Sequence, residues 1–549
     1  NGKWSNRSLN VAIPNSERRS SPRRGPTPFR YSIGLSSMAD GGKVPCPPAR
    51  FFEAMRNTAA IAHPGITERW TLILLGTILA YLVLFAVRFA DERLFMDSGY
   101  YLVRVINEGT LRIEHGRWVL AFAELLPLAG VKLGLSMKTL IMLHSLNNVT
   151  WMIGCIVVAW RILGDRQAAL TIALLHLLGL AHGLFCPVFE LYYGADLIVL
   201  FIALLRAGHL PPRFRMPMLV AIGALAASCH AIGFLLIGAM LLLEQCRVPR
   251  KEAIILTVML ALVATVRIIT ASSYEKESAA FLLKAKELPV LTRVFGWENL
   301  LGLLRYGLFH YPDVLMLAMI TIIALFRARR RGAALFFALF LLMMHILISL
   351  KLPGYLHDRY REQVNLGATA WVTMVLMMYT PLTDRLRRAL PILLLAAITY
   401  RIVTADSLAS YYAERKEHIE RGISLAHESG RSKGIIAAPV YFGPEHDLIE
   451  LGWSVPVESL LLSAKPGPES TVSLITTEDI REGGLDGQLR AFWFRRWDTM
   501  PESWLDERWF IPPSGEYVPL IGESPDDTPH AGTRLPVGPT VQSPDPLDQ

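Results

Sequence analysis

The segment Trp70–Phe89, WTLILLGTILAYLVLFAVRF, decides the fold class, and the polar stretch ADERLFMDSGYY follows it at residues 90–101. A helix needs about 20 apolar residues to cross the hydrocarbon core of a bilayer, and this segment supplies them. Arg56 and Arg69 precede it. Because basic residues gather on the cytoplasmic side of membrane proteins, we expect the N-terminus inside and Ala90 onward outside.

Basic clusters recur between the later apolar segments and fall on every second loop. The loops between them carry acids and aromatic residues instead. This alternation is the positive-inside pattern of a multi-spanning membrane protein, and it predicts that the polar residues suited to catalysis share the outer side. The basic residues are Arg161, Arg166, Arg206, Arg213, Arg215, Arg247, Arg250, Lys251, Arg327, Arg329, Arg330, Arg331, Arg385, Arg387 and Arg388.

The composition supports a membrane protein. Of 549 residues, 52% are hydrophobic and only 19% are charged, whereas about a quarter of the residues of a soluble protein are charged. The net charge of +8 comes largely from arginines in loops and near the N-terminus. No basic domain with interleaved aromatic residues is present, so nucleic-acid binding is not predicted. The five cysteines show neither CxxC nor Cys/His metal spacing.

We predict an all-α polytopic membrane domain over residues 70–404, with about eleven transmembrane helices. The apolar run 216–243 is divided into two short spans because a single helix of that length would exceed the roughly 30 Å hydrocarbon core. Residues 119–134, interrupted by Glu124 and Pro127, are expected to form an interfacial or re-entrant helix. The other predicted crossings are 70–89, 138–160, 168–184, 195–205, 253–271, 313–326, 333–350, 365–380 and 389–404.

The segments before the membrane domain form a predicted disordered basic arm, residues 1–69. The first methionine is Met38. Residues 1–37 are therefore either outside the translated protein or part of a genuine cytoplasmic arm.

After the membrane domain, residues 405–522 are predicted to form a small extracytoplasmic α+β domain. A charged amphipathic helix is expected over 405–429 and strands over 434–442 and 470–477. The tail 523–549 is rich in Pro, Asp and Gly and is predicted to be disordered.

Three polar clusters fall on the predicted outer side: Phe95–Tyr101, with Asp91 and Glu92 just before it, Glu114–Arg117 and His357–Glu362. Glu190 and Asp196 add acids at the outer end of another span. Ionisable groups at membrane depth are costly and indicate function, whereas at the headgroup level they are also found as plain interfacial charges. Both interpretations stay open for each single residue.

The order of these motifs resembles the GT-C superfamily of membrane glycosyltransferases, which includes protein O-mannosyltransferases and the lipid A aminoarabinose transferase. Asp97-Ser98-Gly99-Tyr100-Tyr101 is similar to the acid-then-aromatic motif after the first span, and His115-Gly116-Arg117 to a His-Pro-Pro-like turn. Asp358-Arg359-Tyr360 is similar to the Arg-Tyr motif that opens a late span. Ser98 and Gly116 depart from the usual second acid and proline. The resemblance covers about residues 70–525.

The resemblance implies transfer of a sugar from a polyprenyl-phosphate donor in the bilayer to a glycan, lipid or protein acceptor in the cell envelope. It makes Asp97 the general base for the acceptor hydroxyl. Arg359, with Arg117 second, would hold the lipid phosphate. No metal-binding residues are predicted, and a divalent cation stays an open alternative. The remaining substrate-binding candidates are His115, Tyr100, Tyr101, Tyr360 and Glu190; the two adjacent tyrosines are also interpretable as interfacial anchors.

Two other function classes compete with a glycosyltransferase. A transporter or lipid flippase would also have many spans. It would be expected to show internal repeats and helices broken at the midplane, and the sequence shows no convincing repeat. A non-enzymatic envelope assembly protein would use the C-terminal domain to bind partners. In each case we predict the bacterial inner membrane, with the N-terminus in the cytoplasm and the C-terminus outside.

Overall fold

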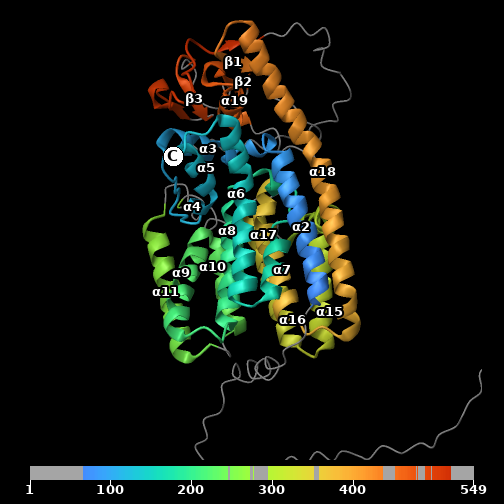
Figure 1. Ribbon diagram of the computed structural model, residues 1–549. Coiled ribbons are helices and arrows are strands. Elements are labelled where there is room, and N and C mark those ends of the chain that lie inside the picture. The colour runs from blue at the N-terminus through green and yellow to red at the C-terminus, as the bar shows by residue number, and fades with distance from the viewer. Residues whose placement is uncertain are drawn as a thin grey trace, which may run out of the picture. The chain divides into compact units, whose positions relative to one another are not determined.

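The computed structural model of this chain is mostly helical (Figure 1). The described ranges are 66–244, 248–271, 276, 295–351, 358–436, 452–477, 479, 489–495 and 498–520. All of them belong to one compact unit. The predicted arm, up to residue 65, and the predicted tail lie outside these ranges.

The helices follow the apolar periodicity of the sequence. They are α2 (Glu68–Arg88), α3 (Asp97–Glu108), α4 (Leu120–Ala123), α5 (Leu125–Lys132), α6 (Met137–Val157), α7 (Arg166–Leu175), α8 (Glu190–Arg206), α9 (Pro212–Cys229), α10 (Ala231–Glu244), α11 (Arg250–Ile269), α14 (Trp297–His310), α15 (Pro312–Arg327), α16 (Arg331–Lys351), α17 (Asp358–Tyr379), α18 (Asp384–Glu428) and α19 (Val455–Ser463). Two 3₁₀ turns matter for the site, η1 (Glu92–Leu94) and η3 (His182–Phe185).

Four of the described helices are long and apolar enough to cross a membrane: Glu68–Arg88, Met137–Ile162, Arg250–Ile269 and Asp384–Glu428. Each predicted crossing overlaps a described helix, and the run 216–243 is broken at His230, between α9 and α10. The number of crossings stays a prediction, because several of the other helices are shorter than a bilayer requires.

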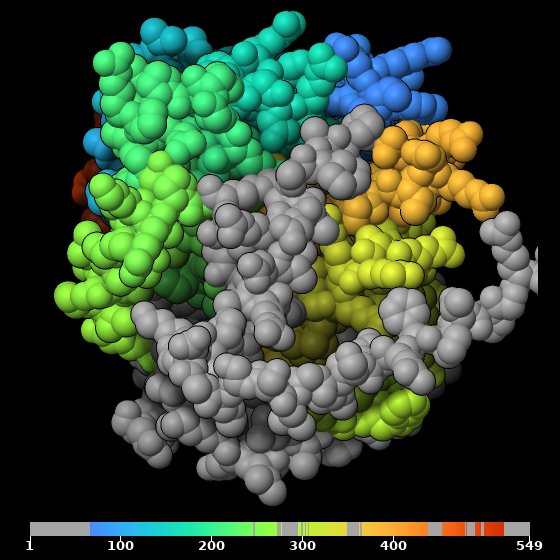
Figure 2. All heavy atoms as spheres, turned by 90° about the horizontal axis from the view of Figure 1, so that it is seen from below, coloured from blue at the N-terminus to red at the C-terminus, as the bar shows by residue number. Residues whose placement is uncertain are grey.

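The basic loops lie at one end of the helices. Arg206 Nε is 2.7 Å from Glu244 Oε1, the Tyr379 hydroxyl donates to the same oxygen at 2.7 Å, and Arg330 donates to the carbonyl of Tyr379 at 3.1 Å. Figure 2 looks onto this lower end. In Figure 1, α3, α5 and the strands lie at the opposite end. We call the end that holds α3, α5 and the strands the polar end.

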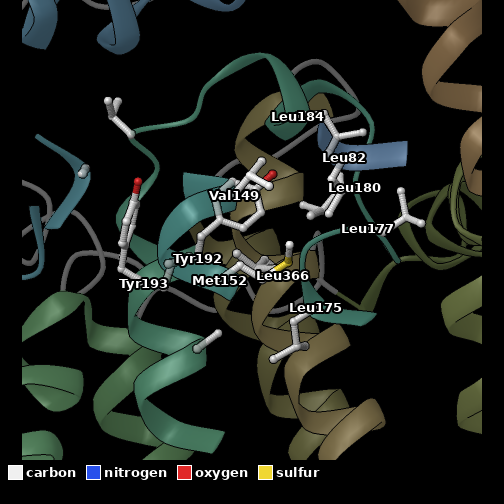
Figure 3. Close-up of a cluster of buried hydrophobic side chains, with 14 of the residues drawn as sticks. Leu82, Val149, Met152, Leu175, Leu177, Leu180, Leu184, Tyr192, Tyr193 and Leu366 are labelled. Atoms are coloured by element: carbon white, nitrogen blue, oxygen red, sulfur yellow. The ribbon is translucent and has the colours of Figure 1, made fainter. Parts of the chain in front are cut away.

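The bundle core is built from α2, α6, α7, α8 and α17, which contact one another. Figure 3 shows part of it, with Leu82, Met152, Tyr192 and Leu366 gathered around the chain between α7 and η3. Gly179 lies in that connection with φ +68°, and a Cβ there would collide with the Thr369 side chain of α17. A glycine is required there because it adopts positive φ and leaves room for the helix.

A buried arginine joins three segments at the polar end. Arg93 of η1 is 2% exposed. Its guanidinium donates to the carbonyl of Leu184 at 2.9 Å, the carbonyl of Ser145 at 2.6 Å and Asn148 Oδ1 at 3.0 Å. A buried charge is costly unless its donors are all satisfied, and here uncharged acceptors of η3 and α6 satisfy them.

Helix α8 corrects the predicted position of Asp196. The helix starts at Glu190, and the residues from Glu190 to Asp196 are helical and buried. Asp196 is 0% exposed and was wrongly placed at the outer end of a span. Its Oδ2 lies 2.8 Å from His176 Nε2. Because His176 is its partner inside the bundle, Asp196 can be buried. Its polarity alone therefore predicted the wrong position.

Helix α18 runs unbroken through the predicted boundary between residues 404 and 405. At 1.5 Å per residue it is about 68 Å long, well beyond a hydrocarbon core of about 30 Å. It continues to the end of the molecule that holds the strands (Figure 1). The predicted charged helix at 405–429 is therefore the far half of the helix that contains the last predicted span.

The strands beyond α18 form two small sheets. β1 (Lys433–Ile436) pairs in parallel with β2 (Ser473–Thr476) and β5 (Val518–Pro519). β3 (Phe492–Arg495) pairs antiparallel with β4 (Asp498–Met500). A small separate core holds Ile435, Ile475, Trp493 and Tyr517, whereas Phe494 and Trp509 join the main core. An independently folding domain at 405–522 stays a prediction.

We expect Arg93→Met to destabilise the protein strongly. The change leaves buried acceptors in α6 and η3 without donors, at about 1–3 kcal/mol for each unsatisfied group. Thermal unfolding of the detergent-purified protein measures the effect. Arg508→Met is the matched control, because the Arg508 side chain is 64% exposed and contacts its sequence neighbours Asp506 and Trp509. Equal unfolding temperatures for the two variants would contradict the role given to Arg93.

Candidate functional site

Asp97 is presented at the start of α3, at the polar end of the bundle. Every residue from Glu92 to Val103 is buried except Asp97, which is half-buried. Its carboxylate belongs to the first helical residue, where the helix dipole favours negative charge. Met96, the residue before it, has φ +58°, an uncommon conformation for a side chain other than glycine.

Both neighbours of Asp97 are anchored inside the protein. The Met96 N–H donates to Glu458 Oε1 at 3.4 Å. The Ser98 hydroxyl donates to the carbonyl of Arg93 and lies 2.7 Å from His144 Nε2 of α6. Since that hydroxyl proton is used, the His144 ring must donate to Ser98 through Nε2. Asp97 is thus held in place on both sides while its own side chain reaches the surface.

Tyr100 and Tyr101 of α3 converge on Glu114. The Tyr100 hydroxyl donates to Glu114 Oε1 and the Tyr101 hydroxyl to Oε2 at 3.5 Å. Burial opposes ionisation of Glu114, but the hydrogen bond from Tyr100 and the charge of Arg112 hold its pKa below the ordinary value. Burial raises the pKa of Tyr101, and the charges of Glu114, Asp97 and Glu190 raise it further. Both rings are buried, so neither is available for sugar stacking in this conformation.

The turn Glu114–Arg117 is held by the ends of two helices. Arg117 Nη1 lies 2.6 Å from Oε1 of Glu190, the first residue of α8. Arg267, in the last turn of α11, donates to the carbonyl of His115. The structure therefore brings together six of the predicted site residues: Asp97, Tyr100, Tyr101, His115, Arg117 and Glu190. Arg267 was not predicted, because nothing in the sequence links α11 to this turn.

The late-span motif is described only in part. The side chains of Arg359 and Tyr360, at the start of α17, lie outside the described part of the structure. Glu362 follows them and is buried. It accepts hydrogen bonds from the N–H groups of Ala181 at 2.9 Å and Gly183 at 2.6 Å, and from the Tyr311 hydroxyl at 2.6 Å. The start of α17 is thereby fixed against η3.

The sequence identified Glu124 only as an interruption between apolar residues. It lies between α4 and α5 and is 1% exposed. Oε2 accepts the N–H of Arg112, while Oε1 has no hydrogen-bond partner among the described residues. Burial raises the pKa of Glu124 to about 8, and the nearby Glu108 and Glu114 act in the same direction. It is thus a carboxyl group that keeps its proton near neutral pH.

Within the described ranges, no three His, Cys, Asp or Glu residues are grouped so that they could hold a metal ion. No family model, curated protein or solved structure matches this chain. The GT-C resemblance therefore stays a prediction from motifs. One departure from the family motif, glycine in place of proline at residue 116, has a structural reason. Gly116 has φ +64°. Proline, fixed near −65°, cannot adopt that conformation.

We predict that Glu124→Gln changes how stability depends on pH. A carboxyl whose pKa is raised from 4.5 to about 8 on folding stabilises the protein at low pH. That contribution is lost as the pH rises through the folded-state value. The variant, which does not titrate, should gain roughly 4 kcal/mol of stability relative to wild type between about pH 5 and about pH 8.5, at about 1.4 kcal/mol for each unit of pKa shift. Unfolding temperatures of both proteins across this range check it; a constant difference would refute it.

Proposed function

We propose that this protein is an integral membrane glycosyltransferase that moves a sugar from a polyprenyl-phosphate donor to a cell-envelope acceptor. The proposal rests on the position and partial burial of Asp97. It is the one half-buried residue in a buried run, its neighbours are anchored on both sides, and it lies at the end of the bundle away from the basic loops. Such a fixed carboxylate at headgroup level suits a general base.

The proposed reaction uses Asp97 to take the proton of the acceptor hydroxyl. As the acceptor oxygen bonds to C1 of the sugar, the bond from C1 to the donor phosphate oxygen breaks. The lipid phosphate leaves with the electron pair of that bond, and Asp97 keeps the proton until it passes to solvent. Atoms and charge balance without a further reactant, so a carboxylate and a cation for the leaving phosphate are the minimum requirement.

Arg117 is the described cation best suited to the leaving phosphate. It is partly exposed, and Glu190 holds its guanidinium from the start of α8. The charges of Asp97, Glu190 and Arg117 all act on the Tyr101 hydroxyl. Arg359, the first candidate from the sequence, has its side chain outside the described residues. A charge-assisted bond to phosphate strengthens as negative charge develops on the leaving oxygen.

A proton-coupled transporter or flippase is the second candidate, favoured by the buried His176–Asp196 pair. The two side chains are 2% and 0% exposed and 2.8 Å apart, and His176 stacks on Tyr192. Ionisable pairs at this depth occur in proton pathways. The two candidates differ in which acid is essential: a transporter depends on Asp196, and the glycosyltransferase on Asp97.

The expected consequence of Asp97→Asn is loss of transfer with normal membrane level. Asparagine keeps the size of the side chain and removes the base, so the chemical step should slow by roughly 10²–10⁴. Envelope glycans and lipid-linked sugars of a deletion strain carrying each variant provide the measurement. Asp384→Asn, an exposed carboxylate at the basic end, is the control. Full transfer by the Asp97 variant would exclude it as the base.

The proposed outer location of the site predicts the result of reporter fusions. Alkaline phosphatase fused after Leu520 should be active, because it folds only outside the cytoplasm. The same enzyme inserted at Gly208, in a basic loop, should be inactive. The reverse pattern would place Asp97 in the cytoplasm and rule out an outer-face acceptor.

A further inference from the structure

The region after the bundle reaches back to the turn that presents Asp97. Glu458, in α19, is buried, and its Oε1 accepts the N–H of Met96 at 3.4 Å. Its other oxygen pairs with Arg415 of α18, which is buried as well. Both residues lie beyond residue 404. A carboxylate more than 350 residues away in the chain therefore contacts the residue before Asp97.

The pair Arg415–Glu458 is tightly surrounded. The Arg415 guanidinium lies 5.0 Å from the centre of the Phe95 ring and donates to Ser454 Oγ at 3.4 Å. Phe95 in turn packs edge-on against Tyr412 of α18, with ring centres 5.1 Å apart. On the same side, Gly99 lies against the carbonyl oxygen of Leu94, which a Cβ at that position would approach to 2.6 Å.

Two further ion pairs also join the segment before Asp97 to the chain beyond residue 404. Lys465 Nζ lies 2.6 Å from Asp91 Oδ2, and Lys416 Nζ lies 3.0 Å from Glu92 Oε1. Both are partly exposed, so each alone stabilises little. Together they bind the segment just before Asp97 to α18 and to the chain after α19. Only the Glu458 contact reaches the backbone of the Asp97 turn.

The backbone at Met96 needs such a contact. Its φ of +58° and ψ of −126° lie outside the regions that side chains other than glycine normally occupy. Conformations of this kind persist only where the surroundings hold them, and they cluster at functional sites. The Met96 N–H donates to a carboxylate oxygen at 3.4 Å, a charge-assisted interaction of the required kind.

We propose that Glu458, held in place by Arg415, is a positioning residue that fixes the Met96–Asp97 turn for transfer. The region beyond the bundle is then part of the active site and not only a module for partners. The anchoring of Met96 stands on its own contacts, while its effect on transfer rests on the proposed function.

Two double variants isolate the hydrogen bond from the buried charges. Glu458→Gln with Arg415→Met removes both charges and keeps an oxygen that accepts the Met96 N–H. Glu458→Leu with Arg415→Met also removes both charges but leaves no acceptor. Replacing a buried ion pair by apolar side chains is often tolerated, so both proteins are expected to fold. If the leucine variant does not accumulate, Glu458→Ala with Arg415→Met replaces it.

Amide hydrogen exchange of the peptide that contains Met96 is the direct readout, since it reports local opening. We expect exchange close to wild type in the glutamine variant and about tenfold faster exchange in the leucine variant. Transfer in the complemented deletion strain should follow, with a loss of about tenfold to 10²-fold only in the leucine variant. Unchanged exchange in the leucine variant would overturn the proposal.

The transfer assay separates the two proposals. Fast exchange with normal transfer by the leucine variant, while Asp97→Asn is inactive, would overturn the positioning role and leave Asp97 as the base. Normal transfer by Asp97→Asn as well would overturn the proposed function, and with it the effect on transfer, while the anchoring of Met96 would stand.

Discussion

The polar end of this protein depends on one buried cation. Arg93 follows the first helix and donates to neutral oxygens of α6 and η3, so a full positive charge is enclosed with its hydrogen bonds satisfied. Three segments that are distant in sequence must meet for that to happen. The carbonyl of Arg93 then receives the Ser98 hydroxyl. The position of Asp97 therefore follows from the burial of the arginine four residues before it.

Much of the helical plan could be predicted because it depends on local composition. Apolar runs of membrane length, the break at His230 and the gathering of basic loops at one end all follow from hydropathy and charge. The start of α8 could not be predicted this way. Glu190 and Asp196 look like loop residues until their partners, Arg117 and His176, are known. Pairings between distant residues leave no periodic pattern in a single sequence.

The candidate site, like the fold, could be predicted from the sequence only in part. The sequence singled out Asp97 and the turn at Glu114–Arg117 because acids and aromatic residues stand out next to an apolar span. It did not reveal that both neighbours of Asp97 are anchored, nor that Glu458 supplies one of the anchors. Hydrophobicity gives the location of the site, and its internal geometry comes from tertiary contacts. The continuity of α18 is a further case, since charged residues extend a helix as well as they end one.

The central claim is that a polyprenyl phosphate binds at the end of the bundle that presents Asp97. The most direct test compares binding of polyprenyl phosphate and of the uncharged polyprenol of equal length to the purified protein. If a cation such as Arg117 holds the phosphate, only the phosphate should bind saturably, and Arg117→Met should weaken it by roughly 10-fold or more. Equal binding of the two lipids, unchanged in the variant, would contradict the account.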